Sequence, residues 1–172
     1  GRAQPIRRAR GVAPSPVRIA FPLGRILACG AEWKNTFCLT RGRYAFVSQH
    51  IGDMENQETL ENFEETVAIY EHLFRAEPAA LACDLHPDYL ASRYAHRRSG
   101  DEGLPLLSVQ HHHAHVASCM ADNDWDPDAG PVLGVVFDGS GYGTDGSIWG
   151  GEFLIADYRG FKRYGHLQAP PL

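Results

Sequence analysis

The stretch ILACGAEWKNTFCLTRGRYAFVS, residues 26–48, decides the fold class. Its apolar and β-branched residues fall into three short runs, ILAC, NTFCLT and YAFVS, which are separated by turn residues at Gly30 and at Arg41–Gly42. Short runs of this kind between turn residues are typical of neighbouring strands. The stretch therefore predicts a meander of three antiparallel strands.

Upstream of this meander, residues 1–22 contain four prolines and five arginines and show no apolar periodicity. Proline removes a backbone donor and disfavours the helical conformation in the residue before it. We therefore expect residues 1–22 to be an extended or irregular connector.

Downstream of the meander, a helix is predicted by apolar residues that recur every three or four positions. These residues are Leu60, Phe63, Val67, Tyr70 and Phe74. We expect Asn56 or Asp53 to cap this helix and Pro78 to end it.

The rest of the chain alternates between strand and helix patterns. Short apolar runs predict strands at residues 80–84 and 104–110, and a helix is predicted between them at 87–98, followed by a loop. Another helix follows the strand at 104–110 directly and extends to about Ala121. Two strands are then predicted in residues 131–158, around a glycine-rich turn.

This order of elements predicts an α/β fold with a mixed sheet flanked by helices. It resembles the ribonuclease-H-like lobe of the actin-like ATPases (ASKHA), and the last segment resembles the opening hairpin of a second, truncated lobe. We expect a connector at residues 1–22, a first lobe at 23–125 and the start of a second lobe at 126–172.

Composition limits the classes of partner. The formal net charge of −5 and the pI near 6.0 argue against a general affinity for nucleic acid or anionic lipid. No apolar run approaches the roughly 20 residues that span a bilayer, so we expect a cytoplasmic protein without membrane contact. The four cysteines are far apart, which favours buried free thiols over a zinc ribbon or a disulfide framework. Because the chain starts with Gly1, we interpret it as part of a longer polypeptide.

Four histidines cluster in VQHHHAHVASC, residues 109–119. On a helix, His111 and His115 lie about 40° apart around the axis, so both imidazoles can face one metal ion. His112 and His115 form a second possible pair. Since His112 stands where a zincin helix has glutamate, metalloprotease chemistry is not supported. A polar, partly exposed helix end remains the alternative.

The segment FDGSGYGTDG, residues 137–146, is the second candidate site. Its glycines allow backbone N–H groups to approach a phosphate closely, and Asp138 at the end of a strand can bind a cation. Ordinary hairpin turn chemistry is the alternative.

Polar residues follow several of the other predicted strands. Lys34 and Asn35 lie at the first hairpin and could contact a phosphate or a carbonyl, although a lysine there is often only solvated. Further candidates, each equally suited to a cap or a turn, are His50, Asp53, Asp84, His86 and Asp88.

Six segments together resemble the HypF carbamoyltransferases of nickel-iron hydrogenase maturation, specifically their Kae1-like domain. They occur in the family's order over essentially the whole chain: RRARGVAP, GAEWKNTFCL, SQHIGDMEN, CDLHPDYLASRYA, VQHHHAHVASCMADN and FDGSGYGTDGSIWGGEFL.

The resemblance implies a two-stage reaction. A YrdC-like domain makes carbamoyl-adenylate from carbamoyl phosphate and ATP, and the Kae1-like domain passes the carbamoyl group to the C-terminal cysteine of HypE. The matching metal ligands are His111, His115 and Asp138, with a further aspartate expected beyond Leu172. Imidazole and carboxylate ligands suit a divalent ion, with iron or zinc placed before manganese or nickel.

The resemblance leaves the catalytic residue unassigned. For nucleotide or substrate binding we consider Lys34, Asn35, Gly139, Ser140, Gly141 and Gly143. Residues 1–22 match the connector that follows the YrdC-like domain, and since that domain is absent we do not expect this segment alone to make carbamoyl-adenylate. Two alternatives remain: a nucleotide- or metal-binding module without turnover, and a relative of the tRNA threonylcarbamoyladenosine enzymes or the O-carbamoyltransferases.

Overall fold

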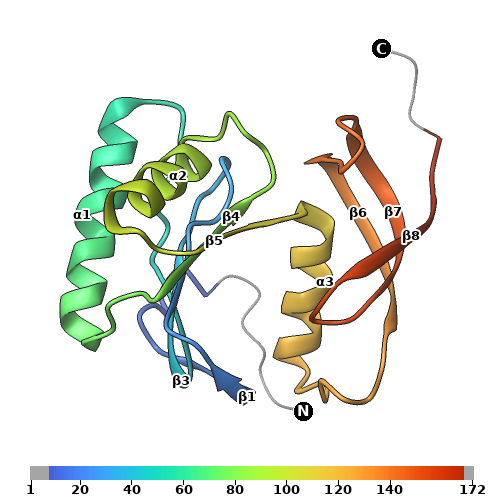
Figure 1. Ribbon diagram of the computed structural model, residues 1–172, viewed down its shortest axis with the longest axis horizontal. Coiled ribbons are helices and arrows are strands. Elements are labelled where there is room, and N and C mark those ends of the chain that lie inside the picture. Colours follow the sequence, from blue (N-terminus) through green and yellow to red (C-terminus); the bar gives the residue numbers. More distant parts are fainter. Residues whose placement is uncertain (1–7, 169–172) are drawn as a thin grey trace. The chain divides into compact units, whose positions relative to one another are not determined.

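The computed structural model describes residues 8–168 and divides into two compact units. Unit 1 extends to Ser108, and unit 2 begins at Val109. Unit 1 combines two helices with a sheet, and unit 2 combines one helix with a second sheet (Figure 1).

Unit 1 contains a five-stranded mixed sheet with the order β1-β3-β2-β4-β5. Strand β3 is antiparallel to both β1 and β2, whereas β2 is parallel to β4. The strands are β1 (Val17–Leu23), β2 (Ile26–Ala28), β3 (Cys38–Val47), β4 (Ala80–Asp84) and β5 (Leu106–Val109). The predicted mixed α/β sheet is therefore present.

The three antiparallel strands are made from different segments than we predicted. Residues 38–47 form the single strand β3, because Gly42 adopts φ +63° and pairs with Leu23 at an irregularity in the ladder instead of reversing the chain. The third strand is β1, so the prediction of a connector is wrong for residues 17–22. Pro22 does not prevent this strand, because β1 is an edge strand of the sheet. Edge strands tolerate a residue that cannot donate a backbone hydrogen bond.

Helix α1 (Gln57–Phe74) begins where the sequence predicted. The Asn56 side chain accepts a hydrogen bond from the Thr59 N–H at 2.9 Å, which confirms it as the cap. The helix ends before Pro78, because Arg75 turns into the left-handed conformation and donates its N–H to the carbonyls of the last turn.

Helix α2 (Leu90–Glu102) is shifted towards the C-terminus relative to the prediction. Tyr89 is its N-cap, and Gly103, with φ +66°, is its C-cap. The residues predicted as the following loop are therefore mostly helical, up to Glu102.

The core of unit 1 joins both helices to the sheet. Phe63 of α1 meets the rings of Phe37 and Tyr94 edge to face, with centroids 5.6 and 5.1 Å away. On the rim, Arg98 of α2 donates to Glu71 of α1 at 2.7 Å. These contacts place α1 and α2 together over the sheet (Figure 1).

Unit 2 consists of one helix packed on a three-stranded antiparallel sheet with the order β6-β7-β8. Its elements are α3 (His111–Asp122), β6 (Val132–Tyr142), β7 (Ile148–Ala156) and β8 (Phe161–His166). Val116 and Met120 of α3 pack with Trp149 and Leu154 of β7. The sequence predicted the first two strands but not β8, whose alternation of polar and apolar residues is short and follows a tight turn.

The division between the units differs from the predicted lobe boundary after residue 125. Helix α3 buries its apolar face on β6 and β7 and therefore belongs to unit 2. Periodicity showed that α3 has an apolar face but not which sheet covers it. Among residues 8–168, no helix is long and apolar enough to cross a membrane.

Candidate metal centre

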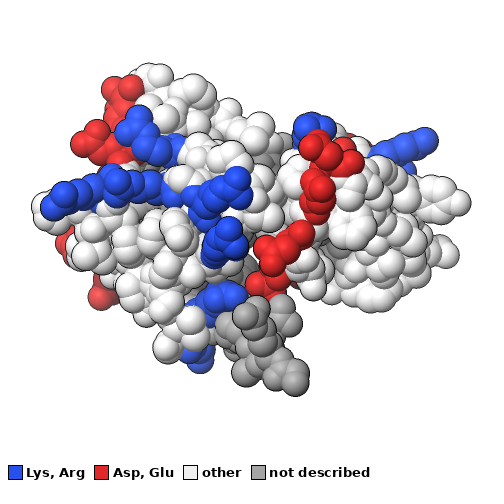
Figure 2. Space-filling view, turned by 90° about the horizontal axis from the view of Figure 1, so that it is seen from below, with Lys and Arg blue, Asp and Glu red and all other residues white. Residues whose placement is uncertain are grey.

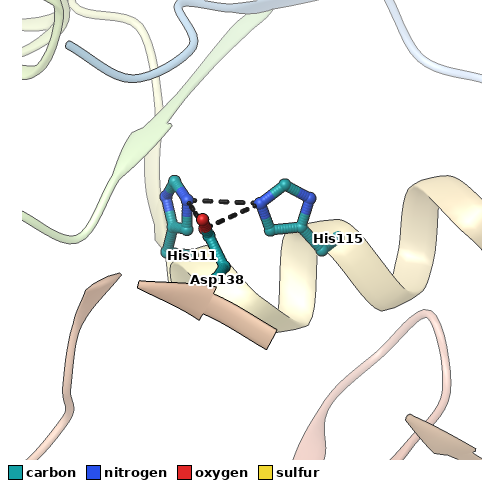
Figure 3. A group of neighbouring side chains, drawn as sticks. All are labelled: His111, His115 and Asp138. Atoms are coloured by element: carbon teal, nitrogen blue, oxygen red, sulfur yellow. Dashed lines mark hydrogen bonds and ion pairs between the residues drawn. The ribbon is translucent and has the colours of Figure 1, made fainter. Parts of the chain in front are cut away.

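The first turn of α3 positions the two predicted histidine ligands. Gln110 caps the helix, because its side-chain oxygen accepts a hydrogen bond from the His113 N–H at 2.9 Å. His111 and His115 are one helical turn apart, and their rings point to the same place, with Nε2 atoms 3.3 Å apart (Figure 3). The predicted pairing of His111 with His115 is therefore present in the structure.

Asp138 of β6 completes the group from the neighbouring sheet. Its Oδ2 lies 2.7 Å from His111 Nε2 and 3.0 Å from His115 Nε2 (Figure 3). The three side chains are partly exposed, at 19%, 52% and 37% for His111, His115 and Asp138. His115 of α3 and Asp138 of β6 are 23 residues apart in the sequence. The packing of α3 on β6 thus brings the three ligand atoms together.

The three atoms fit a small divalent cation. All of them lie within 4.8 Å of one another. In a tetrahedral zinc site, bonds of about 2.0–2.1 Å place neighbouring ligand atoms about 3.3 Å apart. The observed separations of 2.7–3.3 Å reach that value or lie slightly below it, so small side-chain shifts would admit an ion. Neutral imidazole and carboxylate suit iron or zinc. The predicted triad therefore has the donor set and the spacing of half a metal site.

An open cavity of about 600 Å³ borders the triad at His115 and Asp138. Its other walls are mainly apolar and come from α3, β6 and the loop between them, including Met120, Trp125 and Val135. The cavity gives an ion and a further ligand access to the triad.

His112 is fully buried and connects the two elements that carry the ligands. Its Nδ1 lies 3.1 Å from Gln110 Nε2, and its Nε2 lies 3.4 Å from the carbonyl oxygen of Asp138. Because the amide nitrogen can only donate, Nδ1 is the acceptor and Nε2–H donates to Asp138. Burial lowers the pKa of His112, which favours this neutral form. The alternative pair of His112 with His115 is therefore wrong.

The glycine-rich segment serves packing at two of the predicted positions. A Cβ on Gly141 would lie 2.5 Å from Cε1 of His112, and a Cβ on Gly143 would overlap the Trp149 indole. The N–H of Gly143 donates to the Ser147 carbonyl at 2.8 Å, so it is not available to a phosphate. The prediction of substrate binding through the N–H of Gly143 is thus wrong. A Cβ at Gly139 would meet nothing within 4 Å.

The hairpin behind Asp138 is braced by polar contacts. Asp145 Oδ1 accepts hydrogen bonds from Ser147 and from Trp149 Nε1 at 2.9 Å. Arg163 of β8 stacks over the Trp149 ring and forms a two-pronged ion pair with the buried Glu152 at 2.6 and 2.9 Å. Sequence reasoning missed this bracing, because its members come from three different strands and turns.

The other predicted site residues lie in unit 1. Lys34 is exposed, and its N–H donates to Asp53 Oδ1 at 2.6 Å. Asn35 is buried, and its amide nitrogen donates to the carbonyls of Cys29 and Ala31. Its side-chain oxygen has no partner, which leaves one buried acceptor for a ligand or a water molecule. A substrate role for Lys34 and Asn35 stays a prediction.

The acidic residues after β4 have a local structural role. Asp84 Oδ1 accepts from the His86 N–H at 2.9 Å, and His86 Nδ1 accepts from the Asp88 N–H at 3.2 Å. These contacts build the turn that leads into α2, as the turn alternative predicted.

Comparison with protein families places these features in context. The HypF Kae1-like domain family matches residues 23–122, and the family described as carbamoyltransferase, Kae1-like domain, second subdomain, matches residues 134–172. The chain belongs to the HypF Kae1-like domain family. The predicted Kae1-like fold class is thereby confirmed. The two matched ranges divide near the predicted lobe boundary, whereas the compact units divide before α3.

Individual HypF proteins are similar over nearly the whole chain. Carbamoyltransferase HypF2 of Cupriavidus necator is 45% identical over 167 residues, which cover 97% of this chain and 20% of the relative. Carbamoyltransferase HypF of Rhizobium leguminosarum bv. viciae is 46% identical over 169 residues, covering 97% and 21%. This chain therefore spans about one fifth of the length of these HypF relatives.

Two solved HypF structures share the fold. The crystal structure of full-length HypF in the phosphate- and nucleotide-bound form superimposes with a TM-score of 0.85 at 45% identity, covering 92% of this chain and 20% of that chain. The crystal structure of T. kodakarensis HypF gives a TM-score of 0.83 at 37% identity, with the same coverage.

Proposed function

We propose that this chain is the metal-binding part of a HypF carbamoyltransferase, in which His111, His115 and Asp138 bind a divalent ion, iron or zinc. The convergence of their three ligand atoms at 2.7–3.3 Å carries the proposal. In the complete enzyme, the carbamoyl group would come from carbamoyl-adenylate, made from carbamoyl phosphate and ATP. The acceptor would be the C-terminal cysteine of a HypE protein.

The residues of the chain have separate tasks in this proposal. A bound ion would supply positive charge for a carbamoyl or phosphate oxygen. The two neutral imidazoles and the carboxylate would bind the ion. His112 fixes the distance between α3 and β6 through its contact with the carbonyl oxygen of Asp138. Lys34, Asn35, Gly139, Ser140 and Gly141 remain the residues proposed to contact nucleotide or substrate.

The metal assignment is tested by removing single ligands. We expect His111→Ala and His115→Ala each to reduce zinc or iron occupancy of the 172-residue chain to a small fraction of the wild-type value, as measured by elemental analysis after dialysis. His166→Ala, which removes a histidine of unit 2 outside the triad, should retain wild-type occupancy. Normal occupancy in both ligand variants contradicts the metal site.

Carbamoyl transfer is tested separately, in two variants of a complete HypF. One carries the substitution that corresponds to His111→Ala, and the other the substitution that corresponds to His115→Ala. Transfer of labelled carbamoyl groups to HypE should fall at least a hundredfold in each variant, as expected when a metal ligand is lost from a catalytic site. Retained transfer in metal-depleted variants would leave a structural metal site and refute its role in catalysis.

A binding module without turnover is the second candidate, because this chain spans only about one fifth of its HypF relatives. Calorimetry with ATP and AMP on the 172-residue chain distinguishes it from a purely structural segment. Saturable heat without conversion of nucleotide supports the module, and the absence of heat with either nucleotide contradicts it.

A further inference from the structure

A cavity of about 280 Å³ in unit 1 is lined by basic side chains from three parts of the sequence. Arg8 and Arg10 come from the segment before β1, Lys34 from the loop between β2 and β3, and His50 from the segment after β3. The remaining walls are small or apolar, and no acidic residue lines the cavity. Its size suits a small ligand or one group of a larger ligand.

The backbone around this cavity is held by hydrogen bonds. The N–H groups of Val12 and Ala13 both donate to the carbonyl of Arg8, at 3.2 and 3.0 Å, and so close a turn that carries Arg8 and Arg10. The His50 N–H donates to the carbonyl of Ala9 at 3.3 Å. The arginine segment is therefore attached to the end of β3, and its charges are placed by the fold.

Lys34 is presented by an unusual backbone conformation. Its φ is +50°, in the left-handed region that residues with a Cβ rarely adopt. The hydrogen bond from its N–H to Asp53 stabilises this conformation and uses one oxygen of that carboxylate. The lysine side chain lines the cavity. A strained residue that places a cation next to two arginines is consistent with a binding role.

Charge is distributed unevenly over unit 1. Figure 2 shows Lys and Arg side chains gathered in a band across one face of it. Many of its acidic residues belong instead to helices α1 and α2, among them Glu58, Glu61, Glu64, Glu71 and Glu102. The residues that line the cavity thus include three cations and no carboxylate, even though the net charge of the chain is −5.

We propose that Arg8, Arg10, Lys34 and His50 form a binding site for a phosphoryl group, carried by a phosphate ester or an acyl phosphate. Arginine offers paired N–H donors that match phosphate oxygens, and lysine adds a point charge. This site deepens the proposed function, on which the choice of a nucleotide or an acyl phosphate rests, but its residues are separate from the metal triad.

The test is calorimetric titration of the metal-free 172-residue chain, kept in chelator so that phosphate cannot bind through an ion. Inorganic phosphate, freshly dissolved carbamoyl phosphate and AMP are the probes, and adenosine is the uncharged control. We expect saturable binding of the phosphate-bearing probes and none of adenosine. Tighter binding of AMP identifies a nucleotide phosphate, tighter binding of carbamoyl phosphate identifies the acyl phosphate, and equal affinities identify the phosphoryl group alone.

Two variants and one matched control locate the site. Arg10→Gln removes one cation, and Lys34→Asn removes another while asparagine tolerates the left-handed backbone. Each should weaken binding about tenfold or more, as expected for loss of a charge-assisted hydrogen bond. Arg18→Gln removes an exposed arginine of β1 outside the cavity and should bind like the wild type. Circular dichroism and the thermal midpoint verify that all three variants fold.

The results separate this site from the metal proposal. His111→Ala should bind phosphate normally even where it no longer binds metal. The phosphoryl site is overturned if no phosphate-bearing probe binds saturably, if adenosine binds as well as AMP, or if Arg18→Gln weakens binding as much as Arg10→Gln and Lys34→Asn.

Discussion

Three consecutive histidines have three different environments. His111 faces Asp138, His112 is buried between α3 and β6, and His113 lies with Nε2 2.7 Å from the carbonyl oxygen of Asp157. Helical spacing alone allowed His111 or His112 to pair with His115. Which histidine pairs with His115 depends on where β6 packs, and β6 begins 21 residues after His111. The local spacing of the histidines therefore could not identify the pair.

The buried histidine gives a prediction that distinguishes positioning from ligation. His112→Ala should lower zinc affinity about ten- to a hundredfold, because partners that orient ligands typically have effects of this size. His112→Gln should lose less, since its amide can still donate towards the Asp138 carbonyl. Competition with a chromophoric chelator measures the affinities.

His113→Ala is the matched control for that series, because it removes the neighbouring imidazole without touching the contact to Asp138. Its zinc affinity should remain within about threefold of the wild type. If His112→Ala also binds zinc normally, the proposed positioning by His112 is wrong.

The cysteines should differ sharply in reactivity. Burial raises the pKa of Cys29 to about 12 and that of Cys38 to about 11, whereas Cys119 of α3 is exposed. Because the thiolate is the reactive form, a disulfide reagent at pH 8 should label Cys119 at once and the other two only after unfolding. Mass spectrometry of timed samples checks the order, and early labelling of Cys29 would show that the core of unit 1 is open.

At the scale of elements, sequence patterns predicted best where the pattern is long and local. The apolar stripe identified α1, with Asn56 as one of the two caps considered, and β4 was predicted with its observed bounds. Errors arose where pairing decides. Gly42 was predicted to lie in a turn, but it continues β3 opposite Leu23, and the extra residues of that ladder lie in β1. Gly143 was predicted to bind phosphate, but it packs against Trp149. Local patterns supplied the candidates for the triad, namely two possible histidine pairs on a helix and an aspartate in a glycine-rich hairpin, and the resemblance to the HypF family selected His111, His115 and Asp138 among them.

The hairpin between β6 and β7 should depend on Asp145. Hydrogen bonds from Ser147, and then from Trp149, lower the pKa of Asp145 to about 2. Since the folded state lowers this pKa below the unfolded value of about 4, the contribution is complete above about pH 4 and is lost as the pH falls towards 2. Asp145→Asn should therefore reduce the thermal midpoint at pH 7, and the difference from the wild type should shrink below pH 4.

Asp126→Asn is the control for the hairpin variant. Asp126 also closes a turn, by accepting from the Asp128 N–H at 2.9 Å, but it lies in the loop between α3 and β6. Tryptophan fluorescence should shift to the red for Asp145→Asn alone. Equal effects of both substitutions would argue against a specific brace at Trp149.

At the scale of the whole molecule, the three proposed metal ligands of this chain belong to one of the two compact units. Bound zinc should therefore slow hydrogen exchange in α3 and β6 while leaving α1 and α2 unchanged. At a free zinc concentration a hundred times Kd, the expected stabilisation of the binding-competent state is about 2.7 kcal/mol. Exchange measured by mass spectrometry, with His111→Ala as the control, checks this. Equal protection of α1 would show that the units respond as one.

The close contact between Gly141 and His112 also has a genetic consequence. Every missense change in the Gly141 codon adds a Cβ, and that atom would meet the imidazole that joins α3 to β6. A collection of random mutants should consequently yield loss-of-function alleles at this codon, although Gly141 supplies no ligand to the triad. Partial suppressors should map to His112, where a smaller side chain restores the space.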